Sequence, residues 1–349
     1  MHEIARRAGV GKATVSLALR DDPRLRPETR RRIQRLAAKM GYRTNATIAN
    51  LMAQLRASRT PRYQATLALL NVSPDSSALS ASSAWRHRVT GCGQRALQLG
   101  YGLESFWWHQ PGSRPADLAS MLDSRNIRGL IIAGLPDRGG LPAGFDAISG
   151  RFACVSAGVR PGSPALNFSS NDHFATASQA VQRLGQYGCR RMGLVIDPGV
   201  DAGVERRYSA GFLAGQANVE AGGHIPVFAF RPSRETSFRA WVEEHRPDAI
   251  ISIHEEVKTW IAQMDLKVPE EIALVHLDRD EELPDWSGLD QNNPLIGAAA
   301  VDLLVGQLHR NEFGLPEFQK ATHVQSTWVD GPTAREAASP KPELETAAA

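Results

Sequence analysis

The chain has 349 residues, a length that predicts two or three domains. It is 42% hydrophobic and 22% charged, so it can bury a sizeable core, yet its apolar runs are far shorter than the roughly 20 residues of a membrane span. The three cysteines form no Cys-x-x-Cys pair, which argues against a disulfide framework and a cysteine metal site. Polar and basic residues occupy the place of a signal peptide's apolar run, so a cytoplasmic location is expected.

The net charge of +3 is unevenly distributed along the chain. Residues 1–63 carry 15 Lys and Arg against 4 Asp and Glu, a net charge of +11, whereas the remainder carries 25 against 33, a net charge of −8. A small basic head on a larger acidic body indicates that the head contacts nucleic acid. The acidic body is less suited to lie against phosphates.

Three short helices are predicted in the basic head. The first ends at Gly9. The second covers residues 12–19, with apolar side chains three and four residues apart. The third begins near Pro27, because proline is tolerated at the first helical position, and it ends at Gly41.

The tight turn at residues 8–11 joins the first two helices, which indicates a helix-turn-helix. In this motif the second helix enters the major groove and offers its N-terminal side chains to base edges. These belong to Lys12, Ala13 and Ser16, and Thr14 can reach a phosphate. A small helical protein-interaction domain is the alternative, and the strong positive charge of the head argues against it.

A further amphipathic helix is expected after the head. Asn45 is a suitable N-cap, and apolar side chains recur at helical spacing from Ile48 to Leu55. The basic stretch 56–62 that follows is expected to be a linker.

From residue 64 onward, apolar strand-like runs alternate with helical stretches, a pattern typical of parallel α/β sheets. The strand-like runs are residues 67–72, 103–107, 129–133, 153–157, 191–196, 227–230, 249–253 and 272–277. The helical stretches are residues 85–99, 118–125, 174–186, 207–219, 238–245, 257–264 and 296–309. Such a length predicts two packed α/β lobes. The final stretch is rich in Ala, Pro and Glu, and a disordered tail is expected there.

Residues 4–16 read IARRAGVGKATVS, which resembles the headpiece of LacI/GalR-type transcriptional regulators. The match continues through residues 27–33 and 36–43, and in the body through residues 211–212, 246–250 and 291–293. The resemblance implies a homodimer that binds a near-palindromic operator in double-stranded DNA. It also implies a body similar to periplasmic sugar-binding proteins, with a small-molecule effector, expected to be a carbohydrate, between two lobes.

The resemblance assigns DNA contacts to individual residues. Lys12 and Ala13 occupy leading base-reading positions, and Leu17 stands where many members carry an arginine, so it suits an apolar contact to a thymine methyl. The hinge helix of the family matches residues 48–55, where Leu51 wedges into the minor groove. An amphipathic helix that packs only on its own body is the alternative. The expected DNA-binding residues are Lys12, Ala13, Thr14, Ser16, Leu17, Arg20, Arg24, Asn45 and Leu51, with Arg56, Arg59 and Arg62 on phosphates.

Polar and aromatic groups at strand ends are the candidates for an effector site, because ligands of open α/β sheets bind at the carboxyl ends of the strands. The resemblance places Asp172, His254 and Asp278 at effector-contacting positions. An arginine typically precedes the Gly-Phe pair at 211–212, and here the matching register holds Tyr208, just after Arg206 and Arg207. The expected effector-binding residues are Ser73, Asp75, Trp108, Asp172, Arg206, Arg207, His254 and Asp278.

Carboxylates and a tryptophan face suit a sugar, whose hydroxyls pair with acceptors and whose ring carbons pack on aromatics. Each assignment also has a local alternative. Asp172 could cap the helix that follows it, and Asp278 could be a solvated loop residue. Only one of Trp107 and Trp108 can face a cleft, because successive strand residues point to opposite faces.

An enzyme and an extracellular sugar-binding protein are the rival classes. The chain has no phosphate loop, dinucleotide-binding GxGxxG motif or GxSxG elbow. The adjacent residues His254, Glu255 and Glu256 do not converge on one metal ion. An extracellular sugar-binding protein has no use for a basic head.

The sequence therefore predicts a non-enzymatic transcriptional regulator, expected to be a repressor, with no cofactor, metal or membrane partner. The expected fold is a small all-α helix-turn-helix headpiece plus an α/β two-lobed periplasmic-binding-protein-like core of parallel sheets flanked by helices. The expected parts are a headpiece at 1–44, a hinge helix and basic linker at 45–63, an effector-binding and dimerisation domain at 64–330, and a disordered tail at 331–349.

Overall fold

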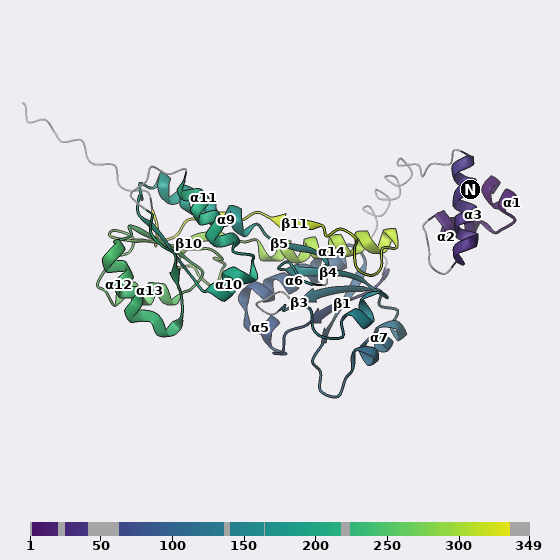
Figure 1. Ribbon diagram of the computed structural model, residues 1–349, viewed down its shortest axis with the longest axis horizontal. Helices are drawn as coiled ribbons and strands as arrows, with labels where there is room; N and C mark the ends of the chain where they lie inside the picture. Colours follow the sequence, from purple (N-terminus) through teal and green to yellow (C-terminus); the bar gives the residue numbers. More distant parts are fainter. Residues whose placement is uncertain are drawn as a thin grey trace, which may run out of the picture.

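The computed structural model describes residues 2–19, 25–40, 63–135, 140–163, 165–217 and 224–335. At its N-terminal end the three predicted helices are present as α1 (His2–Ala8), α2 (Lys12–Leu19) and α3 (Pro27–Lys39) (Figure 1). Their shared core contains Ile4, Val15 and Ile33. Gly9 between α1 and α2 has a φ of 64°, a conformation that glycine adopts without steric cost.

Side chains of α3 hold the ends of the two preceding helices. Arg32 Nη2 donates a hydrogen bond to Ala8 O at 3.0 Å, and Gln34 Nε2 donates to Ala18 O at 2.9 Å. The last carbonyl groups of a helix have no partner inside it, so these bonds satisfy otherwise free acceptors. They also fix α1 and α2 against α3.

The first lobe is built on a parallel sheet with the strand order β11-β5-β4-β3-β1-β2. Its strands are β1 (Ala65–Asn71), β2 (Tyr101–Trp107), β3 (Gly129–Ala133), β4 (Ala153–Gly158), β5 (Asn167–Asn171) and β11 (Ala321–Val324). Side chains alternate between two buried layers, since successive strand residues point to opposite faces. One face packs on α6 (Ser83–Gln98) and α14 (Asn293–Arg310), and the other on α7 (Pro115–Ser124) and α8 (Asp146–Ser149). The short helix α5 (Ala78–Ala81) precedes α6.

The second lobe has a sheet with the strand order β12-β10-β9-β8-β6-β7, in which only β12 is antiparallel to its neighbour. Its strands are β6 (Met192–Ile196), β7 (Phe228–Ala229), β8 (Ala249–Ser252), β9 (Ala273–His276), β10 (Ser287–Asp290) and β12 (Thr327–Val329). One face packs on α9 (His173–Gln186) and α11 (Arg207–Gln216), with α10 (Pro198–Gly203) just before α11. The other face packs on α12 (Glu235–His245), which follows the 3-10 turn η1 (Pro232–Arg234), and on α13 (Glu256–Ala262).

The chain passes between the lobes at residues 171–173, 290–293 and 324–327, so segments far apart in sequence lie together at the junction (Figure 1). Polar side chains join these connections. Asn171 Nδ2 donates to Val324 O at 3.0 Å, and Asn292 Nδ2 donates to Gln325 O at 2.9 Å. The predicted two-lobed α/β architecture is therefore confirmed. Because the connecting segments are bonded to one another, we expect the lobes to move relative to each other about these segments as a hinge.

Two parts of the second half of the chain differ from expectation. Strands β5, β10, β11 and β12 were not predicted, because their sequences are short and polar. The expected tail from residue 331 is wrong for residues 331–335. Thr333 Oγ1 donates to Leu274 O at 2.7 Å and Ala334 is buried in the second-lobe core. Residues 336–349 lie outside the described residues. None of the helices in the described ranges is long and apolar enough to cross a membrane.

Helices α6 and α14 cross at glycines that allow their backbones to touch. A Cβ at Gly91 would lie 1.9 Å from Pro294 O, and a Cβ at Gly297 would lie 2.0 Å from Arg88 O. Neither helix can therefore carry a larger residue at the crossing without separating from the other.

We predict that Gly91→Ala destabilises the protein by about 1–3 kcal/mol, because the added methyl forces α6 away from α14. Gly93→Ala on the same helix is the matched control, since nothing lies within 4 Å of its Cβ position and alanine favours the helix. Urea unfolding of the full chain, followed by circular dichroism, measures both. Equal unfolding midpoints for the two variants would show that the helices do not pack this closely.

Candidate functional site

The junction between the lobes contains a buried polar cluster centred on Arg88 of α6, which is only 9% exposed. Arg88 Nε donates to Asn293 Oδ1 at 2.7 Å, and Asn293 Nδ2 donates to Asp278 Oδ1 at 2.9 Å. Asn293 begins α14 in the first lobe, and Asp278 follows β9 in the second. One amide therefore links a cation of one lobe to a carboxylate of the other.

Aromatic and amide groups of the second lobe complete the cluster. Gln291 Nε2 donates to the hydroxyl of Tyr208 at 2.7 Å and to Leu277 O at 2.9 Å. His173, at the start of α9, packs edge-on against Tyr208 with ring centroids 4.9 Å apart. Side chains from α6, α9, α11 and α14 therefore meet at one place.

Burial decides the protonation of these groups. Burial raises the pKa of Asp278 to about 6, although the charge of Arg88 and the hydrogen bond from Asn293 act in the opposite direction. Burial lowers the pKa of His173 to about 3, and the positive charges of Arg88 and Arg207 lower it further. The pKa of Tyr208 is raised by burial and by the charge of Asp278. At pH 7, His173 is thus neutral and Asp278 is mostly ionised.

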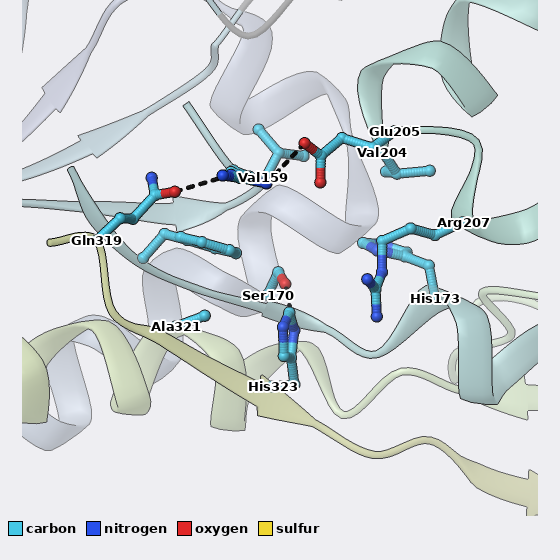
Figure 2. Close-up of a pocket in the computed structure, with 11 residues that line it drawn as sticks. Val159, Ser170, His173, Val204, Glu205, Arg207, Gln319, Ala321 and His323 are labelled. Atoms are coloured by element: carbon cyan, nitrogen blue, oxygen red, sulfur yellow. Dashed lines mark hydrogen bonds and ion pairs between the residues drawn. The ribbon is translucent and has the colours of Figure 1, made fainter. Parts of the chain in front are cut away.

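A cavity of about 220 Å³ adjoins His173 and is lined by both lobes. Figure 2 shows Ser170 of β5, His323 of β11 and Arg207 of α11 directed toward the same space. Ser170 Oγ and His323 Nδ1 share a hydrogen bond of 3.0 Å. A pocket lined by polar side chains from several elements can orient a small polar ligand.

Ion pairs connect the lobes on both sides of the cluster. Arg160, which follows β4, pairs through Nη1 with Glu205 Oε1 at 2.9 Å at one edge of the cavity (Figure 2). Near the start of α6, Ser83 donates to Asp280 and Arg86 pairs with Glu282. These contacts hold the lobes together around the junction.

The expected effector residues of the second lobe are distributed unevenly. Asp278 belongs to the buried cluster, and Arg207 lines the cavity. Asp172 caps α9 by accepting from Ala175 N at 3.3 Å, which is the local alternative, and it also accepts from Arg207 Nη2 at 3.0 Å. Arg206 has a φ of 58° before α11 and is not part of the cavity lining.

His254 lies at the end of β8, where it is engaged by its own lobe. Its Nε2 accepts from Asp197 N at 2.9 Å, and its ring stacks on Phe230 with centroids 3.7 Å apart. Burial lowers the pKa of His254. The structure therefore gives His254 a local packing role and does not place it in the cavity lining.

The expected residues of the first lobe lie outside the cluster. Trp108 packs in the lobe core against Phe145, with ring centroids 5.9 Å apart, so the plain-core alternative describes it. Trp107 instead reaches the strand ends, where its Nε1 donates to Ser73 O at 2.9 Å. Asp75 is exposed and accepts from Ser77, which lowers the pKa of Asp75.

Arg88, Asn293, His173 and Tyr208 were not among the expected effector residues. One feature of the sequence could have identified Arg88. It lies four residues before Cys92 and eight before Ala96, so it shares the buried face of its helix with apolar residues. Asn293 lies in a stretch that carried the family resemblance, and Tyr208 holds the register of the family's arginine, but no ligand role was assigned to either.

The structure also places some of the expected DNA-binding residues. Lys12, Ala13, Thr14, Ser16 and Leu17 all lie on α2, which packs through Val15 and Ala18 into the headpiece core. Thr14 and Leu17 are half-buried. The remaining expected contacts lie outside the described residues, namely Arg20, Arg24, Asn45, Leu51, Arg56, Arg59 and Arg62.

Comparisons with family models match two parts of the chain. Residues 1–45 match the bacterial regulatory proteins of the lacI family, and residues 181–327 match the periplasmic binding protein-like domain. A curated relative, the HTH-type transcriptional regulator CelR of Thermobifida fusca, is 24% identical over 325 residues, which cover 87% of this chain and 90% of that protein.

Two solved structures show the same fold over most of the chain. A complex of the transcriptional regulator CelR with cellobiose has a TM-score of 0.59 at 20% identity and covers 95% of this chain and 98% of that one. The lac repressor dimer bound to operator and the anti-inducer ONPF has a TM-score of 0.54 at 19% identity and covers 95% and 97%. The headpiece therefore matches the lacI family of bacterial regulatory proteins, and the chain shares the fold of these two regulators.

Proposed function

We propose that this protein is a transcriptional regulator that binds operator DNA as a homodimer and acts as a repressor, with an affinity controlled by a carbohydrate bound at the lobe junction. The observation that carries the effector half is the polar chain from Arg88 through Asn293 to Asp278, which joins the two lobes. A ligand that contacts this chain interacts with both lobes at once. Its contacts therefore differ between an arrangement with the lobes apart and one with the lobes together. Such a difference is what a ligand needs in order to shift the equilibrium between the two arrangements.

Carbohydrate chemistry fits the groups at the junction. Each sugar hydroxyl both donates and accepts hydrogen bonds, and the junction offers a guanidinium donor beside a carboxylate acceptor. His173 lines the cavity and is the aromatic ring against which sugar C–H groups can pack there. The related CelR structure contains cellobiose, so β-linked disaccharides are the first candidates.

The DNA half of the proposal uses α2 as the recognition helix. Lys12, Ala13 and Ser16 face base edges of the major groove, and Thr14 contacts phosphate. Leu17 contacts a thymine methyl, and Leu51 of the proposed hinge helix enters the minor groove at the operator centre. The protein acts in the cytoplasm, and this role requires no catalysis. We assign residues 1–44 to the headpiece, 45–63 to hinge and linker, and 64–335 to the effector-binding and dimerisation domain.

We predict that cellobiose, tested with other mono- and disaccharides, raises the thermal unfolding temperature of the full-length protein, because a ligand of the native state stabilises it by mass action. At 100 times the Kd the stabilisation is about 2.7 kcal/mol. The absence of any shift across the whole panel would contradict a carbohydrate effector.

The affinity for such a ligand should rise with pH. Hydroxyls that donate to Asp278 favour its ionised form, and its pKa of about 6 in the free protein leaves it mostly protonated at pH 5. Calorimetric titration at pH 5 and pH 7 should give roughly tenfold tighter binding at pH 7. The rise should vanish in Asp278→Asn. His173 and His276, with pKa values of about 3 and about 4, stay neutral across this range and do not contribute. The same rise in Asp278→Asn would show that another group is responsible.

Selection of bound duplexes from a random DNA library should yield a near-palindromic motif. With that duplex, Arg56, Arg59 and Arg62 replaced together by alanine should reduce the slope of log affinity against log salt, by roughly 0.9 for each phosphate that is no longer neutralised. The control variant replaces Arg114, Arg125 and Arg335 by alanine and so removes the same positive charge. These three arginines pair with acidic residues on the body surface. Identical slopes for the two variants would contradict phosphate contact by the linker.

A further inference from the structure

Arg88 has hydrogen-bond donors that the described protein does not use. Its Nε bonds to Asn293, whereas Nη1 and Nη2 make no hydrogen bond to any residue in the described ranges. The side chain is nevertheless more than nine-tenths buried. In the described residues neither Nη atom is among the enclosed polar atoms without a partner, so both are open to solvent at the lobe junction and available to a ligand.

The surroundings hold the guanidinium in one orientation. Trp85, one turn earlier on α6, covers its face, with Arg88 Cζ 5.0 Å from the ring centroid. Gly158 at the end of β4 lies at its edge, where a Cβ would approach Nη1 to 2.9 Å and Trp85 to 3.0 Å. The absence of a side chain at residue 158 therefore leaves room for the guanidinium between α6 and β4. A donor held by stacking on one face and by Asn293 at Nε loses little freedom when it binds a ligand.

Asp278 offers the complementary acceptor. Its Oδ1 accepts from Asn293, and Oδ2 receives no hydrogen bond from the described part of the chain. Because the same amide fixes both charged groups, free donors and a free acceptor are presented a short distance apart. The charge of Arg88 also acts on His173, which lines the cavity between the lobes. Arg88 therefore acts on a residue of the cavity lining, although neither Arg88 nor Asp278 is itself part of that lining.

Resting on the function proposed above, we propose that Arg88 is a specificity-determining residue of the effector site, and that its Nη donors together with Asp278 Oδ2 bind adjacent hydroxyls of a neutral carbohydrate. One hydroxyl oxygen accepts from the guanidinium, and the neighbouring hydroxyl donates to the carboxylate. A sugar acid or sugar phosphate fits less well, because its negative group would lie beside Asp278. Arg207, one of the two arginines expected at the effector site, pairs with Asp172 inside the second lobe, whereas Arg88 contributes its contact from the first.

The test uses calorimetric titration of the full-length protein with cellobiose as the probe. Arg88→Met keeps a similar volume without the donors, but it also removes the positive charge that acts on Asp278, so its stability is compared with that of Arg88→Lys. Arg88→Lys keeps the charge but not the fork of donors, and serves if the methionine variant does not fold. Arg95→Met, on the exposed side of the same helix and paired with Asp302, is the matched control.

We expect the two Arg88 variants to bind cellobiose at least tenfold more weakly than wild type, while Arg95→Met binds as wild type does. Thermal unfolding without ligand separates this from a structural role, because a ligand contact predicts weaker affinity with retained stability. Wild type should also bind cellobiose at least tenfold more tightly than its acid analogue cellobionate. If both Arg88 variants bind cellobiose as tightly as wild type does, this inference alone is overturned. The same holds if wild type binds cellobionate more tightly than cellobiose. Failure of wild type to bind any neutral sugar of the panel overturns the carbohydrate half of the proposed function, and this inference with it.

Discussion

One contact, between Arg88 of α6 and Asn293 of α14, connects helix packing in the first lobe with the polar groups of the lobe junction. Arg88 is enclosed where the chain passes from one lobe to the other, and its only hydrogen-bond partner in the described residues is Asn293. That contact exists because α6 and α14 cross with glycines at their closest points, Gly91 and Gly297. The close crossing brings the first residue of α14 beside Arg88. Helix packing in the first lobe and polar chemistry between the lobes therefore depend on the same contact.

The same junction explains how a small ligand can influence a distant DNA-binding element. The two sheets are separate, and their connecting segments are bonded to one another through Asn171 and Asn292. Such connections restrict the lobes to a small set of relative positions. Groups that belong to different lobes, such as Arg160 with Glu205 and Arg88 with Asp278 through Asn293, respond to those positions. An effector that completes the polar chain favours one arrangement, and in the proposed homodimer this preference is passed on to the proposed operator-binding end.

Much of this architecture was predictable from apolar periodicity, because central strands buried on both faces read as continuous apolar runs. The runs at 129–133 and 153–157 became β3 and β4. Strand β5 was missed because its sequence is NFSSN, although all of its residues are buried. Its polar groups are satisfied by distant partners, for example Ser169 Oγ with Ile296 O at 2.8 Å. Partners brought together by tertiary structure leave no pattern in the local sequence.

The candidate site was predictable only in part, for a related reason. Asp278 follows a recognisable strand, and the structure places it in the junction. Arg88 lies in the middle of a helix, so a search of strand ends passed over it. Trp108 was preferred to Trp107 although the direction of each side chain depends on strand register, which residue type alone does not specify. Which polar groups meet depends on how the elements of the two lobes are arranged around the junction. The composition of a single segment does not specify this arrangement.

Coupling between the two ends of the molecule is the central claim, and reciprocal binding measurements test it most directly. The affinity of the full-length protein for its selected operator duplex is measured with and without saturating carbohydrate, and the affinity for the carbohydrate with and without the duplex. The account predicts that both affinities change by one and the same factor, clearly different from one. A protein that binds both ligands with affinities independent of each other would contradict it.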